Sequence, residues 1–347
     1  MTAFRTRVYA FFLAAITVCL SFGREASAHV GTGIDLDRQG LIYFTDTYHN
    51  CIWRLESNGT LTAVFRGVHL DYLIIGEDGY VYVIKDGIWK ISPHGEMTEV
   101  LNSRQFPEGG RPLCIDRQAN TYFINSDPQL KRVPEIYRRT AQGKVTVIAG
   151  GDEPQQDVQA VQALFRHINS AVCTPDGSLY VRDDQYIRRV SPDGIVSTLA
   201  HSEDAAMAEG GEDRLVRTMG MAVDVAGNVY VANYWKRAVM KVTPDGKVST
   251  MATSRWPWAP VGVAIAGGDI YVLERMGNPY GAGLIEVSTL ADRLGSPRVR
   301  KVSPDGAITT LVVVKGDRGL AVIVVPLILA TAALFVWLIR KRRAKRA

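Results

Sequence analysis

The sequence has few of the residues, and none of the motifs, on which common catalytic and metal sites are built. It contains six histidines and four cysteines in 347 residues. No Gly-x-Ser-x-Gly elbow, His-Glu-x-x-His helix or phosphate-binding loop occurs. These absences argue against several hydrolase, metalloprotease and nucleotide-binding classes, and they favour a protein that binds a ligand over one that catalyses a reaction.

Cysteine is also too sparse for a disulfide framework. Cys19 lies in an apolar N-terminal segment, which leaves Cys51, Cys114 and Cys173 at wide spacing and without a CxxC pair. An odd number of separated cysteines does not indicate a framework of bridges. We interpret the three as small buried apolar residues, with one bridge among them as the alternative.

Helical patterns are confined to the two ends of the chain. Residues 1–28 have the features of a secretory signal peptide, with Arg5 and Arg7 before an apolar run and Ala26-Ser-Ala28 as the cleavage site. The mature chain would then begin at His29. An uncleaved N-terminal anchor is the alternative.

The C-terminal apolar segment predicts a transmembrane helix. Gly319–Ile339 is uncharged, and a helix of this length spans about 30 Å, the thickness of the hydrocarbon core of a bilayer. Six basic residues follow in 340–347, and such clusters stay cytoplasmic. We therefore expect a single-pass protein of the cell membrane, with 29–318 outside the cytoplasm. A sorting signal that is removed after export is an alternative reading of the segment.

The part between these ends has no excess of positive charge. The chain has 40 basic and 35 acidic residues; three basic and one acidic fall in 1–28, and six basic fall in the tail. Residues 29–318 therefore keep 31 basic and 34 acidic residues. This balance gives no reason to expect a nucleic-acid partner.

What the sequence does contain is a repeat. Each copy has an apolar strand, an Asp/Gly-rich turn, a strand opening with tyrosine, a third strand, a tight turn and a fourth strand, which we call A to D. The marker tyrosines are Tyr43, Tyr82, Tyr122, Tyr180, Tyr230 and Tyr271. The turns before the fourth strands are Ser57-Asn-Gly59, Ser92-Pro-His-Gly95, Ala141-Gln-Gly143, Ser191-Pro-Asp-Gly194, Thr243-Pro-Asp-Gly246 and Ser303-Pro-Asp-Gly306.

The repeat predicts an all-β fold. Its strands are rich in Val, Ile and Tyr in alternation, and its glycines suit hairpins that need a positive φ. Six copies indicate a six-bladed β-propeller with four antiparallel strands per blade, followed by the one C-terminal transmembrane helix. The predicted blades are 33–66, 73–101, 113–149, 171–200, 220–252 and 262–314. A β-sandwich is the alternative.

Several of these segments resemble NHL repeats. They are Asp46-Thr-Tyr-His-Asn50, Ile148-Ala-Gly-Gly151, Leu179-Tyr-Val181 and Tyr186–Gly194. The resemblance covers 29–318 and implies a propeller, but it says little about function. Lys85 departs from the pattern, because an aspartate usually follows the second strand.

Related propellers of the gluconolactonase and regucalcin type hold a divalent metal with a Glu, an Asn and an Asp. Asn169 matches the asparagine, whereas Thr32 and Met219 stand at the other two positions. The resemblance thus implies a metal-dependent lactone or ester hydrolase only as the alternative function. We predict no cofactor and no metal ligand, and we leave enzymatic activity open.

The same positions predict a polar cluster at the mouth of the channel. Asp71, Arg111 and Asn169 come from consecutive blades, and His69 and His167 lie two residues before the first and third of them. Such groups can orient a polar or anionic ligand. The alternatives are a structural Asp71–Arg111 pair and an open zinc site. We expect a binding module for a protein, glycan or small ligand.

Two further expectations concern the loops on this face. The residues three after each tyrosine should cap the turn between strands B and C; they are Asp46, Lys85, Asn125, Asp183, Asn233 and Glu274. The face should also lie near the bilayer, because aromatic residues gather in loops of the last two blades. These aromatic residues are Trp235, Trp256, Trp258 and Tyr280. Packing between blades is the alternative role for them.

Overall fold

The computed structural model describes residues 33–47, 49–67, 70, 72–85, 87–102, 111–125, 134–150, 165, 168–183, 186–201, 220–234, 236–276 and 297–314. The chain divides after Val30 into two compact units, of which the first lies outside these ranges. The predicted signal 1–28, membrane helix 319–339 and tail 340–347 also lie outside them. The described ranges contain no helix able to cross a membrane.

The described ranges form 24 strands in six sheets. Blade 1 contains β1 (Ile34–Leu36), β2 (Ile42–Asp46), β3 (Cys51–Leu55) and β4 (Leu61–Arg66). Blade 2 contains β5 (Tyr72–Ile75), β6 (Val81–Ile84), β7 (Gly87–Ile91) and β8 (Met97–Asn102). Blade 3 contains β9 (Arg111–Ile115), β10 (Thr121–Asn125), β11 (Glu135–Arg139) and β12 (Val145–Gly150).

The second half of the chain repeats the arrangement. Blade 4 contains β13 (Ile168–Cys173), β14 (Leu179–Asp183), β15 (Tyr186–Val190) and β16 (Val196–His201). Blade 5 contains β17 (Met221–Val223), β18 (Val229–Asn233), β19 (Ala238–Val242) and β20 (Val248–Thr253). Blade 6 contains β21 (Trp258–Ala266), β22 (Asp269–Met276), β23 (Arg298–Val302) and β24 (Ile308–Val313).

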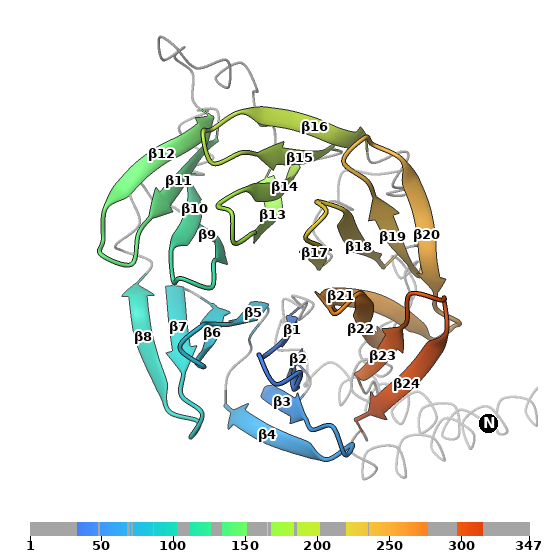
Figure 1. Ribbon diagram of the computed structural model, residues 1–347. Coiled ribbons are helices and arrows are strands. Elements are labelled where there is room, and N and C mark those ends of the chain that lie inside the picture. Colours follow the sequence, from blue (N-terminus) through green and yellow to red (C-terminus); the bar gives the residue numbers. More distant parts are fainter. Residues whose placement is uncertain are drawn as a thin grey trace, which may run out of the picture. The chain divides into compact units, whose positions relative to one another are not determined.

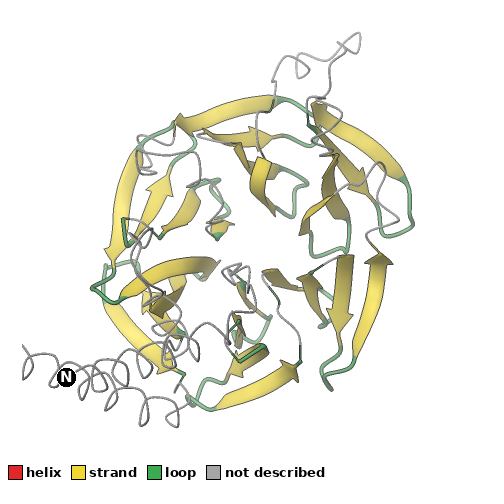
Figure 2. Cartoon of the chain, turned by 180° about the vertical axis from the view of Figure 1, so that it is seen from behind, coloured by secondary structure: helices red, strands yellow, loops and turns green. Residues whose placement is uncertain are grey.

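The six sheets form a closed ring, with the first strand of each blade innermost and the fourth at the rim (Figure 1). Figure 2 shows the same ring from behind. Within every sheet the strands pair antiparallel in sequence order, and β1 contacts β21 where the last blade meets the first. The prediction of a six-bladed, four-stranded propeller is confirmed, and the β-sandwich alternative is wrong.

The hydrophobic core lies between neighbouring sheets. One cluster joins Leu113 and Ile136 of blade 3 to Leu179 and Val181 of blade 4. Similar clusters connect blade 1 to blade 2 and blade 2 to blade 3. Alternating apolar residues therefore face the adjacent blade, because each sheet must cover the apolar face of the next.

The marker tyrosines anchor the turns between strands A and B. Each lies second in its strand, or third in β22, rather than opening it as expected. The Tyr82 hydroxyl donates to Asp78 at 2.7 Å and the Tyr230 hydroxyl donates to Asp224 at 3.1 Å. Burial, together with the charge of Asp224, raises the pKa of Tyr230 to about 12. In blades 1, 2, 3 and 5 the tyrosine hydroxyl therefore holds the turn aspartate in place.

We expect Tyr230→Phe to lower the free energy of unfolding by about 1 kcal/mol, the net value of one hydrogen bond. Tyr271→Phe is the matched control, because the turn before Tyr271 contains Gly267 and Gly268 and no aspartate. Urea denaturation of the two variants measures the difference. Equal losses would show that the bond to Asp224 contributes nothing.

The turns between strands C and D contain the glycines that the sequence predicted. The six glycines have φ between 84° and 91°, a region that L-residues with side chains disfavour. Three of them also approach the preceding blade: a Cβ on Gly95 would lie 2.8 Å from the Val64 carbonyl oxygen. A Cβ on Gly246 would lie 2.7 Å from the Leu199 carbonyl oxygen, and one on Gly194 would lie 2.7 Å from that of Ile148. These hairpin tips therefore pack against the outer strand of the neighbouring blade.

Gly246→Ala is expected to lower the free energy of unfolding by about 3 kcal/mol, because backbone strain and a clash with a carbonyl act together. Gly306→Ala isolates the strain, since Gly306 has a φ of 85° but no atom near its missing Cβ. It should cost about 1 kcal/mol. Thermal unfolding in parallel gives both values, and a Gly306 variant as unstable as the Gly246 variant would contradict the role of the blade contact.

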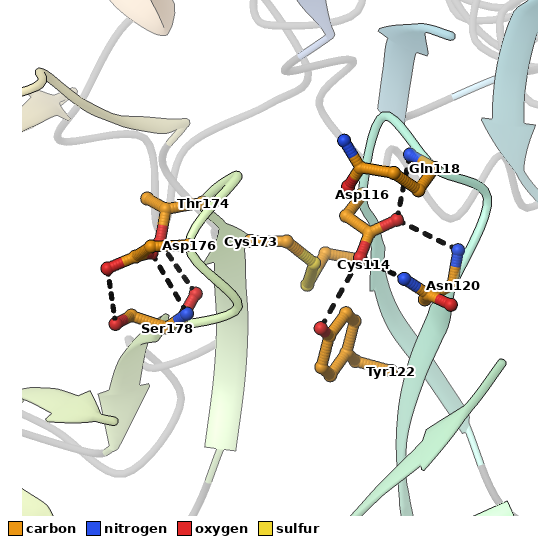
Figure 3. Close-up of a disulfide and its surroundings, with 9 residues drawn as sticks. All are labelled: Cys114, Asp116, Gln118, Asn120, Tyr122, Cys173, Thr174, Asp176 and Ser178. Atoms are coloured by element: carbon orange, nitrogen blue, oxygen red, sulfur yellow. Dashed lines mark hydrogen bonds between the residues drawn. A yellow bond between two sulfur atoms is a disulfide. The ribbon is translucent and has the colours of Figure 1, made fainter. Parts of the chain in front are cut away.

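A disulfide joins blades 3 and 4. Cys114 at the end of β9 and Cys173 at the end of β13 are bonded, with a Cα–Cα distance of 6.2 Å. Figure 3 shows the bridge beside the A–B turns of the two blades, where Asp116 accepts a bond from Tyr122. The interpretation of three separate cysteines is wrong for this pair, because the ring brings equivalent ends of adjacent inner strands together. It holds for Cys51, which is free and buried.

Candidate functional site

The predicted mouth residues fall where the inner strands begin. Arg111 is the first residue of β9, Asn169 is the second residue of β13, and Asp71 directly precedes β5. The side chains of Arg111 and Asn169 lie outside the described part of the structure, as do Asp71, His69 and His167 entirely. Because β9 contacts β13, the backbones of Arg111 and Asn169 belong to neighbouring strands. Their role in binding stays a prediction.

The inner strands are tied together at their opposite ends. Asp35 of β1 accepts from the Ile75 backbone N–H of β5 at 2.9 Å and from Arg117 of blade 3 at 3.1 Å. Arg117 also donates to the Ile75 carbonyl at 2.9 Å. Burial raises the pKa of Asp35, and the Arg117 charge opposes that rise. With the disulfide between β9 and β13, these contacts connect the central strands of blades 1 to 4.

The expected turn caps are present in two blades. The Asp46 carboxylate accepts from the His49 backbone N–H at 3.2 Å, and the Asn233 side chain accepts from the Lys236 backbone N–H at 2.9 Å. Lys85 is exposed and the side chain of Asn125 lies outside the described residues. The capping role is therefore confirmed at Asp46 and Asn233.

Asp46 also organises two aromatic rings. Its side chain is fully buried, and its Oδ2 atom lies 2.6 Å from His49 Nδ1 and 2.9 Å from the indole nitrogen of Trp53. A buried carboxylate that orients an imidazole in this way is an arrangement that enzymes use for proton transfer. In this chain His49 belongs to the repeat motif, and the bonds of Asp46 to its backbone and ring hold the turn.

Acidic residues at the same position form charge pairs in blades 4 and 6. In blade 4 the buried Asp183 carboxylate lies 3.1 Å from Arg188. In blade 6 the Glu274 side chain is fully buried and contacts Arg298 and Arg300, the latter at 2.6 Å. The Ser254 hydroxyl donates to the same carboxylate. Sequence reasoning missed this cluster, although the spacing of Arg298 and Arg300 places both on one face of β23.

A small cavity lies between blades 6 and 1. It is lined by Asp46 and Thr47 of blade 1 and by Val261, Glu274 and Arg275 of blade 6. Its volume of about 10 Å³ gives room for about one water molecule. It therefore belongs to the contact that closes the ring and is too small for an organic ligand.

The charged groups in the described ranges do not gather in a metal site. No group of three or more His, Cys, Asp or Glu side chains suited to a metal ion occurs there. Asp46, Asp183 and Glu274 each contact cationic or ring N–H groups instead. The metal ligands that the alternative hydrolase function requires would have to come from the mouth residues whose side chains lie outside those ranges.

No protein-family model matches the sequence, and no curated protein is similar to it. Solved structures nevertheless share its architecture. A calcium-binding protein, regucalcin, from Agrobacterium tumefaciens superimposes with a TM-score of 0.51 at 18% identity, over 83% of this chain and 92% of its own. A luciferin-regenerating enzyme superimposes with a TM-score of 0.52 at 17% identity, over 83% of this chain and 93% of its own. The chain has the fold of these propellers.

A gluconolactonase from Xanthomonas campestris has the same fold. It gives a TM-score of 0.50 at 16% identity, over 72% of this chain and 83% of its own. At such low sequence identity the similarity establishes the fold alone. The activities in the names of these proteins are theirs and are not transferred to this chain.

Proposed function

We propose that the chain is an exported, membrane-anchored propeller of NHL type that binds a protein, a glycan or a small polar ligand where its inner strands begin. The observation that carries the proposal is the position of the disulfide. It links β9, whose first residue is Arg111, to β13, whose second residue is Asn169. A covalent link between these strands fixes the spacing of the two residues, and a preorganised site binds with a smaller loss of entropy.

The proposed location outside the cytoplasm has two supports. Disulfides persist mainly in oxidising compartments, and the bridge between Cys114 and Cys173 therefore agrees with export. The N-terminal segment 1–28 has the features of a signal peptide, and 319–339 is long and apolar enough to span a bilayer. The propeller then lies on the extracytoplasmic side, with the basic tail 340–347 in the cytoplasm.

Crosslinking on membranes from cells that express the full chain tests the binding function. Partners captured by the unaltered chain should be lost with Arg111→Ala and Asn169→Ala. Lys85→Ala is the control, because Lys85 is exposed and lies outside the proposed cluster. A capture pattern that is identical for all variants would contradict a binding site at Arg111 and Asn169.

A metal-dependent lactone or ester hydrolase is the competing function, because Asn169 stands where gluconolactonase-like propellers carry a metal-ligating asparagine. Metal analysis of the purified chain, followed by a lactone and ester hydrolysis screen, separates the two. The binding module should show no activity that depends on a divalent metal. Stoichiometric metal with hydrolysis, both lost in Asp71→Ala and Asn169→Ala, would establish the enzyme instead.

A further inference from the structure

The turn that joins β20 to β21 presents an exposed tryptophan. Trp256 is 76% exposed, and Arg255 beside it is also exposed. A single exposed apolar residue is ordinary in a soluble protein. This turn is different because it is closed by a bond from the Trp258 backbone N–H to the Arg255 carbonyl, at 3.0 Å, and is held by two neighbouring segments.

The first of these segments is the turn between β18 and β19. Arg237 donates from its guanidinium to the backbone carbonyls of Ser254 and Trp258, on either side of Trp256. The Ser254 backbone N–H donates in return to the Arg237 carbonyl at 2.6 Å. Both ends of the turn are thereby fixed to blade 5, and the exposed side chain is held at the tip.

The second segment is the beginning of β23. The guanidinium of Arg298 lies 4.3 Å from the centre of the Trp258 ring, and the same guanidinium pairs with the buried Glu274. Trp258 is therefore packed in place, whereas Trp256, two residues earlier, has no such cover. Arg237 and Arg298 thus both hold the turn in place, although its exposed residue, Trp256, contributes little to the core.

The turn lies beside the end of the described propeller. Arg298 pairs in register with Val313 at the end of β24, and the Val314 backbone N–H donates to the Pro297 carbonyl at 2.9 Å. Only residues 315–318 separate this point from the apolar segment 319–339. Four extended residues reach at most about 14 Å.

We propose that the Trp256 turn docks into the lipid–water interface next to the membrane helix. This inference rests on the proposed anchor at 319–339. Tryptophan favours the interface, where its ring meets the acyl chains and its N–H meets water. Arg255 and Lys236, both exposed, add attraction to anionic headgroups. The docked turn holds blades 5 and 6 against the bilayer and sets the direction in which the mouth faces.

Tryptophan quenching in vesicles of phosphatidylcholine and phosphatidylglycerol tests the docking. The full chain is reconstituted with lipid that carries a spin label just below the headgroup. Trp337 lies inside the proposed anchor and is removed first, as Trp337→Phe. Quenching should remain in this variant and should be lost when Trp256→Phe is added. Adding Trp89→Phe in place of Trp256→Phe is the matched control and should leave the quenching unchanged.

The possible outcomes separate the docking from the anchor. If Trp337→Phe alone abolishes all quenching, the anchor stands and the docking is overturned. If neither tryptophan is quenched, both proposals are overturned. Quenching of Trp256 without a contribution from Trp337 would overturn the anchor, and with it the proposal that the turn docks next to a membrane helix. Because Trp256 is exposed, its replacement should leave thermal unfolding of the chain unchanged.

Discussion

Replacing Cys114 and Cys173 with alanine is expected to lower the free energy of unfolding by about 4 kcal/mol. The bridge closes a loop with a sequence separation of 59 residues. In the chain-entropy model, a crosslink over a loop of this size removes about 4 kcal/mol of conformational entropy from the unfolded state.

Guanidinium denaturation with and without reductant measures the effect. Reduction should bring the unaltered chain to the stability of the double variant and leave the double variant itself unchanged. Cys51→Ala is the control for removing a cysteine that forms no bridge. Burial raises the pKa of Cys51 to about 11, which keeps its thiol unreactive. Three free thiols in the denatured, unreduced chain would show that the bridge does not form.

The repeat could be predicted because its determinants are local. The turn glycines, such as Gly246, meet a backbone requirement within their own hairpin, and Tyr230 bonds an aspartate six residues earlier. The residues that determine the structure of a blade therefore lie within its own repeat, and the number of repeats gives the number of blades. The three or four residues of each turn, repeated at a similar spacing, are enough to indicate the repeat.

Contacts between blades could not be predicted in the same way. Cys114 and Cys173 meet only because the ring places equivalent ends of inner strands next to each other. Asp35, Ile75 and Arg117 come from three blades, and none of the three departs from the pattern of its own copy. The sequence did locate Arg111 and Asn169 at the beginnings of inner strands, since that position follows from alignment on the tyrosines.

Glu274 forms a buried charge cluster with Arg298 and Arg300. Replacing it with glutamine is expected to lower the free energy of unfolding by about 3 kcal/mol. The carboxylate is fully buried between Arg298 and Arg300, whose side chains are 15% and 10% exposed. Glutamine keeps the volume but leaves two buried guanidinium groups without a compensating charge, and breaking a buried pair is costly.

The matched control is Glu77→Gln. Glu77 lies 3.8 Å from Arg38, and both side chains are exposed, so its loss should change stability by less than about 0.5 kcal/mol. Chemical denaturation of both variants gives the comparison. Adding Arg300→Met to Glu274→Leu should recover part of the loss, because the apolar pair removes one of the two unpaired charges. A Glu274 variant no less stable than the Glu77 variant would mean that water already screens the cluster, and that Arg298 is held over Trp258 by the aromatic contact alone.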